Sequence, residues 1–339
     1  MTAEKIVIHS GVYSMSETKR SNRSSSIILE AVRNDLGLGV AFLVLFVGAS
    51  ILLGGTFFAW KNFSNVLRQL STNMFLACGM TFVIMLGGID LSVGSVIAMV
   101  GCFSAGFISY VGMPSGIAVL LAILIGVLIG FFNGFLAAFT TIPPFIITLS
   151  TMNICRGIAR VYSNTKTITV SNEFFKSIAS TYIGVLPIQV VYIIVVIAVS
   201  AVILNRTQLG RQILATGGNK QAAAYSGVNT KKITIFVFTF SGLLASLAAV
   251  IQASRLFAGT HTAGEGAEMD AIAAVVLGGT SMSGGSGSIS GTVIGVFIIA
   301  IMNNVMNLYG IDSSWQYIVK GIVILIAVSI DYFRGLRQS

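Results

Sequence analysis

Long apolar segments alternate with short polar or glycine-rich breaks along most of this chain. Each segment holds about 20 residues, the length at which a helix crosses the hydrocarbon core of a bilayer. The second, fifth and eighth segments carry polar residues or are interrupted by Gly or Pro. We expect about ten spans, near residues 38–59, 66–86, 93–113, 116–140, 144–162, 187–204, 233–253, 269–285, 288–309 and 315–333. The pattern predicts an all-α integral membrane protein with broken or re-entrant glycine-rich segments.

The composition supports this class. The chain has 339 residues, of which 55% are hydrophobic and 9% are charged, whereas a soluble domain carries about 25% charged residues. So few charges cannot cover a soluble surface of this size, and the apolar segments are therefore expected to face lipid.

The net charge of +9 is concentrated in the two tails and one loop, which is not the distribution of a nucleic-acid-binding face. An excess of Lys and Arg marks the cytoplasmic side of membrane proteins. An even number of spans places these regions together: a cytoplasmic tail over residues 1–35, a coupling loop at 205–232 within a single permease domain at 36–333, and a C-terminal tail at 334–339. The clustered basic residues are Lys5, Lys19, Arg20, Arg23, Arg33, Arg206, Arg211, Lys220, Lys231, Lys232, Arg334 and Arg337.

Catalytic chemistry has no visible basis in the sequence. A phosphate-binding loop needs Gly, four residues and then Gly-Lys-Ser/Thr, and no Gly-Lys-Ser/Thr occurs. His9 and His261 have no setting of a catalytic triad or a metal site. The three cysteines, Cys78, Cys102 and Cys155, lie singly in apolar segments and are expected to be small buried residues. We expect no catalytic residue, no metal and no cofactor in this chain.

Glycines recur in two patterns. Gly126, Gly130 and Gly134 lie four apart, as do Gly291 and Gly295, a spacing that lets two helix backbones approach but that also arises by chance in a glycine-rich chain. In addition, "LGGIDLSVGS" (86–95) resembles "LGGTSMSGGSGS" (277–288). This is either a weak internal repeat that places broken helices in two halves of a transporter, or the convergence of two glycine-rich turns.

The basic loop contains a candidate short helix. Gly217-Gly218-Asn219 can end one element and cap the next, and the small-residue run from Lys220 to Ser226 allows about two helical turns before Gly227. A helix of this kind, with its alanines outward, could bind a partner protein. The alternative is an ordinary cytoplasmic connector.

Three motifs in order identify a resemblance: "GMTFVIMLGGIDLSVGS", "ILATGGNKQAAAYSGVN" and "MDAIAAVVLGGTSMSGGSG". Together with "NNVMNLYGIDSSWQYIVKG" (303–321), they resemble the permeases of bacterial ATP-binding-cassette importers for monosaccharides, above all the ribose type. The similarity runs from about residue 40 to the end. It implies a permease homodimer or pseudo-symmetric pair in the inner membrane, a cytoplasmic ATPase that uses ATP and Mg, and an extracytoplasmic sugar-binding protein.

The resemblance also gives candidate roles to residues. The loop helix would dock into the ATPase, with Tyr225 and Val228 as the side chains that enter its groove. The candidate coupling residues are Asn219, Ala222, Ala223, Tyr225, Ser226, Gly227 and Val228. The candidate broken-helix glycines are Gly87, Gly88, Gly94, Gly278 and Gly279.

Asp90 is an acid in a chain that otherwise avoids charge. A charge within the membrane is costly unless it is paired or hydrated. Asp90 could cap the helix that restarts near Ser92–Ser95, accept sugar hydroxyls, or lie at the cytoplasmic surface. The Asp-Leu-Ser-Val-Gly spacing favours the cap. In a rival class, a secondary transporter driven by an ion gradient, Asp90 would be the coupling carboxylate.

Neutral amides and hydroxyls suit a sugar pathway because they offer many modest hydrogen bonds without trapping the sugar. Each could instead bond to a neighbouring helix, and we expect about half to touch the path. The candidates are Asn73, Asp90, Ser92, Asn133, Thr148, Asn153, Asn303 and Asn304, with Thr81 as a further neutral polar residue within a span.

Overall fold

The computed structural model describes residues 39–40, 42–51 and 53–336. The expected N-terminal tail, 1–35, and the last residues of the C-terminal tail lie outside this range. Within it, four helices are long and apolar enough to cross a membrane by length and composition: α5, α8, α11 and α13.

The described part of the chain is mostly helical. Its helices are Phe42–Ile51, α2 (Gly55–Phe58), α3 (Trp60–Met85), α4 (Val93–Ser109), α5 (Ser115–Phe139), α6 (Pro144–Ser163), α7 (Glu173–Ser180), α8 (Gln189–Arg206), α9 (Gln208–Gly218), α10 (Lys220–Tyr225), α11 (Thr230–Leu256), α12 (Ala267–Leu277), α13 (Ile289–Leu308) and α14 (Ser313–Leu336). Two antiparallel strand pairs are short, β1 (Ile168–Thr169) with β4 (Ala258–Gly259) and β2 (Tyr182–Ile183) with β3 (Leu186–Pro187).

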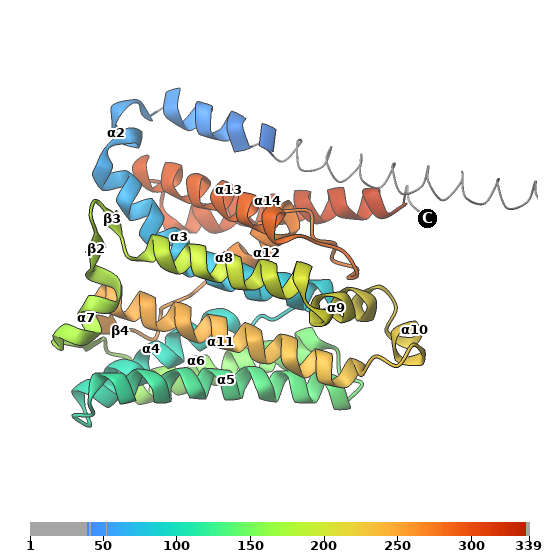
Figure 1. The fold of residues 1–339 in the computed structure, drawn as a ribbon. Coiled ribbons are helices and arrows are strands. Elements are labelled where there is room, and N and C mark those ends of the chain that lie inside the picture. Colours follow the sequence, from blue (N-terminus) through green and yellow to red (C-terminus); the bar gives the residue numbers. More distant parts are fainter. Residues whose placement is uncertain (1–38, 41, 52, 337–339) are drawn as a thin grey trace, which may run out of the picture.

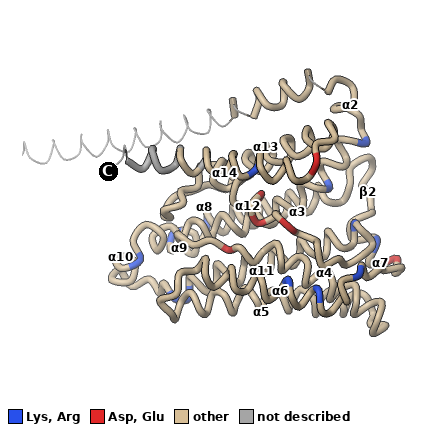
Figure 2. The backbone as a smooth tube through the Cα atoms, turned by 180° about the vertical axis from the view of Figure 1, so that it is seen from behind, with Lys and Arg blue, Asp and Glu red and all other residues tan. Residues whose placement is uncertain are grey.

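The long helices lie roughly side by side in one bundle with two distinct ends (Figure 1). One end carries α2, α7, β2 and β3, and we call it the α7 end. The other carries α9, α10 and the last turns of α14, and we call it the α10 end. Lys and Arg gather near these two ends, beside α7 and β2 and beside α9 and α10 (Figure 2).

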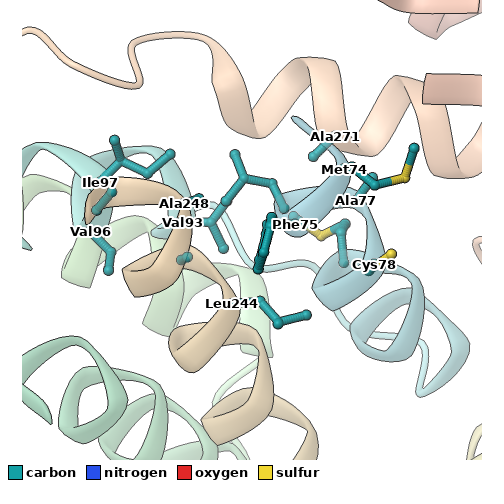
Figure 3. Packing of buried hydrophobic residues seen from close by; sticks show 14 of the residues in the cluster. Met74, Phe75, Ala77, Cys78, Val93, Val96, Ile97, Leu244, Ala248 and Ala271 are labelled. Carbon is teal, nitrogen blue, oxygen red and sulfur yellow. The ribbon is translucent and has the colours of Figure 1, made fainter. Parts of the chain in front are cut away.

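The core is formed where α3, α4, α11 and α12 meet. Phe75 of α3, Val93 and Ile97 of α4, Leu244 of α11 and Ala271 of α12 belong to one cluster of buried apolar side chains (Figure 3). By contrast, the outward faces of α5, α8 and α14 expose large apolar side chains such as Leu120 and Ile194. A helix with an apolar exterior suits lipid contact, because lipid is as apolar as the side chains themselves.

The glycine spacing on α5 forms a true helix interface. A Cβ atom added to Gly130 would lie 2.5 Å from the backbone oxygen of Phe238 and 2.9 Å from Cα of Gly242, and one added to Gly134 would lie 2.9 Å from Cα of Ile235. The absence of side chains therefore brings α5 against α11. Gly295 of α13 similarly packs on the backbone of Ala274 in α12, where an added Cβ would lie 1.9 Å from the carbonyl oxygen.

Eight of the ten expected spans correspond to helices of 17 residues or more, whereas over 38–59 the described helices are only Phe42–Ile51 and α2, and the eighth span is wrong in length. Over 269–285 the structure has α12, which ends at Leu277 and is followed by a glycine-rich loop. Eleven residues make a helix of about 17 Å, which is short of a hydrocarbon core of about 30 Å. The chain turns at Gly279, which has a φ of 83°, a conformation that glycine adopts without strain. Ten full spans are therefore not confirmed.

The polypeptide before α12 is re-entrant. Residues 258–266, the re-entrant segment, run antiparallel along α4: a Cβ on Gly259 would lie 2.5 Å from the oxygen of Gly101, and one on Gly264 would lie 2.4 Å from the oxygen of Gly94. Gly94 and Gly101 are seven positions apart, which corresponds to about 10 Å along the helix. Helix α12 thus begins within the bundle instead of at its α7 end.

The α5–α11 interface gives a first prediction. Gly130→Leu should lower the thermal unfolding temperature of the purified protein in detergent, because overpacking a close interface costs about 1–3 kcal/mol. Gly116→Leu is the matched control on the same helix, since no atom lies within 4 Å of its added Cβ. Equal unfolding temperatures for the two variants would contradict the interface.

Candidate functional site

A polar cavity opens near the α7 end between α3, α11 and α13. Its volume is about 460 Å³. Most of its lining offers amides or guanidinium groups: Asn62, Asn65, Arg68, Gln69, Arg255, Leu256, Asn304, Asn307 and Leu308. We call it the outer cavity.

A second cavity, of about 180 Å³, adjoins the first through Gln69, Arg255 and Asn307, which line both. We call it the inner cavity. It lies against α12 and α14 as well as α3, α11 and α13. Its remaining lining consists of Thr72, Asn73, Gln252, Gly264, Glu265, Ala267, Asp270, Asn303, Gln316 and Lys320. Of the residues expected along a sugar path, the two cavities thus bring together Asn73, Asn303 and Asn304.

One face of α3 connects the cavities. Asn62, Asn65, Gln69 and Asn73 follow one another at spacings of three or four residues, which places them on the same side of a helix. From the first to the last, this stripe extends over about 17 Å. The stripe is a sequence signal, and only its last member was among the expected path residues.

Asp90 lies elsewhere, in a closed network between α3 and α4. One carboxylate oxygen accepts hydrogen bonds from the backbone N–H of Ser92 at 3.0 Å and from its hydroxyl at 2.6 Å. The other accepts from the hydroxyl of Ser241 on α11 at 3.0 Å. The residue is 1% exposed and lines neither cavity. Asp90 therefore organises the start of α4, bonding the N–H just before the helix, and it is not at the surface.

The neighbouring polar residues continue this network. The amide of Asn133 donates to the hydroxyl of Ser92 at 3.0 Å and accepts from Thr151 at 2.7 Å. The hydroxyl of Thr148 donates to the carbonyl of Ile89 and accepts from the N–H of Leu91. These side chains supply partners for the backbone of the break between α3 and α4, so they hold helices together and do not line the cavities.

Two further expected residues also lie away from the cavities. Asn153 is exposed on the outside of α6, where its amide donates to the carbonyl of Leu149 on the same helix at 3.0 Å. Thr81 forms a hydroxyl pair with Thr292 of α13 at 2.7 Å.

The Leu-Gly-Gly turn after α3 and the glycine-rich loop that follows α12 meet at the α10 end. The N–H of Gly285 donates to the carbonyl of Met85 at 2.8 Å. Gly217, at the end of α9, approaches the same carbonyl so closely that an added Cβ would lie 1.7 Å from its oxygen. We call this meeting of 85–88, 217–218 and 283–285 the glycine junction.

The candidate broken-helix glycines have distinct roles. Gly87 and Gly279 have φ of 75° and 83° and turn the chain after α3 and α12. Gly278 packs on Gly291 of α13, and Gly94 is where the re-entrant segment touches α4. Gly88 is buried, and an added Cβ would be in ordinary contact with Phe238 at 3.4 Å.

Helix α10 has the form expected from the sequence. Asn219 accepts from the N–H of Ala222 at 2.9 Å and caps it, while Gly227, with a φ of 83°, turns the chain after it. The hydroxyl of Ser226 donates to the carbonyl of Ala222 at 2.9 Å. Tyr225 is 92% exposed, which leaves its ring free for a partner.

Two details of α10 correct the expectation. Ala222 and Ala224 are exposed, but Ala223 is buried, because it lies on the side of the helix that faces the rest of the chain. Val228 is half-buried and packs against the apolar core. The outward surface of α10 therefore includes Ala222, Ala224 and Tyr225 together with Lys220 and Gln221, but not Ala223 or Val228.

Arg156 of α6 anchors the re-entrant segment and was not expected from the sequence. The same Nη1 atom donates to the carbonyl oxygens of His261 and Ala263 at 2.8 and 2.7 Å. A non-helical segment inside a bundle leaves carbonyls unpaired, and a guanidinium group can satisfy two of them at once. A buried ion pair between Asp270 and Lys320 was also missed, because α12 and α14 supply one residue each.

The described residues offer no metal site. No group of three or more His, Cys, Asp or Glu side chains is placed to hold a metal ion among them. Cys78, Cys102 and Cys155 are free and buried, as expected from their apolar surroundings.

A family model and several curated proteins, all of them permeases, match most of this chain. Residues 62–328 match the family model described as "Branched-chain amino acid transport system / permease component". The chain is 44% identical over 309 residues to the ribose import permease protein RbsC of Bacillus subtilis, covering 90% of this chain and 95% of that protein. It is 39% identical over 307 residues to the probable ABC transporter permease protein YphD of Escherichia coli, covering 90% and 92%. It is 33% identical over 353 aligned positions to the xylose transport system permease protein XylH of Haemophilus influenzae, covering 86% and 94%. No solved structure matches the chain.

The network around Asp90 gives a second prediction. In Asp90→Asn the amide oxygen still accepts both bonds from Ser92, and the amide nitrogen can donate to Ser241, so the unfolding temperature should stay close to that of the wild type. Asp90→Ala leaves the buried N–H of Ser92 without a partner and should destabilise the protein by about 1–3 kcal/mol. Equal losses in thermal unfolding for both variants would contradict the closed network.

Proposed function

The chain belongs to the family of permease components of branched-chain amino acid type transport systems, and from this membership we propose that it is the membrane subunit of an ATP-driven importer for a monosaccharide, with D-ribose as the first candidate. The observation that carries the proposal is the identity of 44% to a ribose import permease over 90% of this chain. The family description names amino acids, but the relatives named for a substrate are named for ribose and xylose.

The lining of the outer and inner cavities supports the proposal that the substrate is neutral and polyhydroxylated. Their walls combine amide donors and acceptors from four helices, and such groups exchange hydrogen bonds with hydroxyls without holding them tightly. We place the entrance of the path at the α7 end. A sugar released by an extracytoplasmic binding protein would enter there.

The surface of helix α10 supports the proposal that an ATPase binds there. Its outward surface bears no acidic residue and presents an exposed tyrosine between small side chains, a shape that fits a groove. Hydrolysis of ATP, with Mg, is the work of that partner, because this chain has no phosphate-binding loop. The permease homodimer is likewise part of the proposal.

The glycine junction gives this coupling a physical route. A displacement of α10 moves α9, because the two helices share the residue Asn219 as cap. The end of α9 touches the carbonyl of Met85 and the backbone of Gly285. With no side chains between them, the three turns cannot move independently. ATPase closure would therefore shift the Leu-Gly-Gly turn after α3 together with the loop at 283–285 and open the α10 end.

The rival reading, an ion-gradient-driven transporter with Asp90 as its coupling carboxylate, has less support. Asp90 is enclosed by three hydroxyl or N–H donors. A coupling acid must exchange its proton or ion with the pathway, and Asp90 lines neither cavity.

The orientation of the chain gives a third prediction, since both tails and the basic loop are proposed to be cytoplasmic. In a cysteine-free background, Lys166→Cys, at the α7 end, should react with an impermeant thiol reagent in intact cells. Lys220→Cys, on α10, should react only after the inner membrane is opened. Both residues are exposed, so burial cannot explain a difference. Labelling of the Lys220→Cys variant from outside would reverse the orientation.

The surface of α10 gives a fourth prediction. Tyr225→Ala should reduce co-purification of the ATPase and lower sugar uptake at least tenfold, because aromatic anchors of an interface commonly contribute about 2 kcal/mol or more. Tyr225→Phe keeps the ring and is the matched control. Wild-type co-purification and uptake in Tyr225→Ala would remove α10 from the interface.

Reconstitution tests the function itself. Proteoliposomes containing this chain with the ATPase and binding protein encoded beside its gene should accumulate D-ribose when ATP is supplied, with no effect of a protonophore while ATP is held constant. L-Leucine is the comparison substrate, since the family description names amino acids. Uptake of L-leucine without any sugar, or uptake abolished by the protonophore, would refute the proposal.

A further inference from the structure

Three polar residues from three helices meet at the wall of the inner cavity: Asp270 of α12, Asn303 of α13 and Lys320 of α14. Lys320 Nζ lies 2.9 Å from Oδ1 and 3.0 Å from Oδ2 of Asp270. The amide of Asn303 donates to Asp270 Oδ2 at 3.1 Å. We call this group the Asp270 triad, and all three of its members line the inner cavity.

We propose that the Asp270 triad is a subsite of the permease that binds hydroxyl groups of the sugar during translocation. The proposal rests on the function proposed above and adds to it the place where this chain itself contacts the substrate. The triad lines the inner cavity together with Asn73, the last member of the amide stripe of α3, so a sugar that enters the outer cavity from the α7 end reaches it after leaving its binding protein.

The hydrogen bonding of the triad is incomplete. Asn303 is 6% exposed, and its Oδ1 has no partner among the described residues. An unpaired buried carbonyl oxygen is costly. By comparison, the adjacent Asn304 forms a reciprocal amide pair with Asn62, at 2.8 and 3.1 Å. Asn303 therefore retains a buried acceptor without a partner among the described residues, on a side chain that lines the inner cavity.

A purely structural role explains the triad less well. An ion pair inside a bundle is expensive to bury, and apolar side chains of similar volume commonly stabilise such a contact better. The rest of α14 is apolar around Lys320, with Ile318 and Ile322 exposed on its outer face. The ion pair of Asp270 and Lys320 is therefore better explained if the two charged groups bind a ligand.

The chemistry of the triad matches a neutral polyol. A sugar hydroxyl can donate to Asn303 Oδ1 or to the Asp270 carboxylate, and a neighbouring hydroxyl can accept from the Lys320 ammonium. The two charges cancel, so the subsite does not favour a charged substrate. The inner cavity, at about 180 Å³, is several times the roughly 30 Å³ that one water molecule occupies in the liquid.

The test uses the complete importer in proteoliposomes and measures D-ribose uptake together with ATP hydrolysis. In Asn303→Leu, and in the neutral double variant Asp270→Asn/Lys320→Met, ATP hydrolysis stimulated by the loaded binding protein should stay within twofold of the wild type. D-Ribose uptake should fall at least tenfold, so that at least five times more ATP is consumed for each sugar carried.

Thr292→Val is the matched control. It removes a buried hydrogen bond, to Thr81, from the same helix, but it lines neither cavity, and both rates should stay at the wild-type level. Uptake and hydrolysis that fall together in Asn303→Leu, or that both stay unchanged, would overturn the subsite.

A charge exchange separates binding from a structural ion pair. Asp270→Lys/Lys320→Asp keeps opposite charges at the two positions but places an ammonium group beside Asn303. Wild-type uptake in this variant would overturn the subsite, whereas a loss of at least tenfold with normal ATP hydrolysis would support it.

A direct binding measurement covers the case in which the charge variants fail to assemble. Saturation-transfer NMR of millimolar D-ribose with the wild-type permease–ATPase complex, without binding protein, should show a signal that Asn303→Leu reduces at least fivefold. No signal with the wild type would overturn the subsite. A wild-type importer that takes up no D-ribose would instead overturn the proposed function, whereas wild-type uptake with unchanged Asn303→Leu uptake would overturn the subsite alone.

Discussion

Every backbone N–H and C=O group within a membrane needs a partner, because lipid offers none. An unbroken helix meets this condition by itself, but this chain leaves helical structure inside the bundle in the break after α3 and in the re-entrant segment before α12. In the first break, Thr148 bonds the carbonyl of Ile89 and the N–H of Leu91, and Asp90 accepts the N–H of Ser92. In the re-entrant segment, Arg156 bonds two carbonyls. These polar side chains are what allow irregular backbone at this depth, and the proposed pathway depends on that irregular backbone.

The breaks give the two ends of the bundle different properties. Near the α7 end, the shortened α12 leaves space that amide side chains of α3 and α13 line, and the outer and inner cavities result. At the α10 end, glycines let three turns meet with direct backbone contact, as between Gly285 N–H and the carbonyl of Met85. The α7 end thus carries the two polar cavities, whereas at the α10 end the three turns are in contact and a separate pocket of about 200 Å³ lies beside α9 and α10. This asymmetry suits an importer that admits sugar at one end and is opened at the other by an ATPase.

Hydrophobic length and local signals account for what the sequence predicted well. Apolar runs of about 20 residues predicted eight of the long helices, and Asn219 and Gly227 marked the ends of α10 because capping and left-handed turns depend on local residues. Features that need a partner distant in the chain were missed. Asp270 and Lys320 are 50 residues apart, and the carbonyls that Arg156 binds lie more than 100 residues away. The sequence pattern also did not predict which way single side chains face. Ala223 is buried and Asn153 is exposed, and only the packing of α10 and α6 decides this. The residues of the polar stripe of α3 recur at helical spacing, so the sequence contains this signal. Hydrophobicity alone defined the expected span, and it does not mark a polar stripe.

The central claim is that the glycine junction closes the α10 end and opens when the ATPase acts. Thr280 is fully buried beside Gly287, whose added Cβ would lie 2.7 Å from its Oγ1, so a thiol at this position reports on the junction. The measurement is the rate at which Thr280→Cys, in a background without Cys78, Cys102 and Cys155, reacts with an impermeant thiol reagent applied from the cytoplasmic side of inverted vesicles that contain the whole importer. The account predicts slow reaction without nucleotide and a rate at least tenfold higher during ATP turnover with loaded binding protein. Equal rates under the two conditions would contradict it.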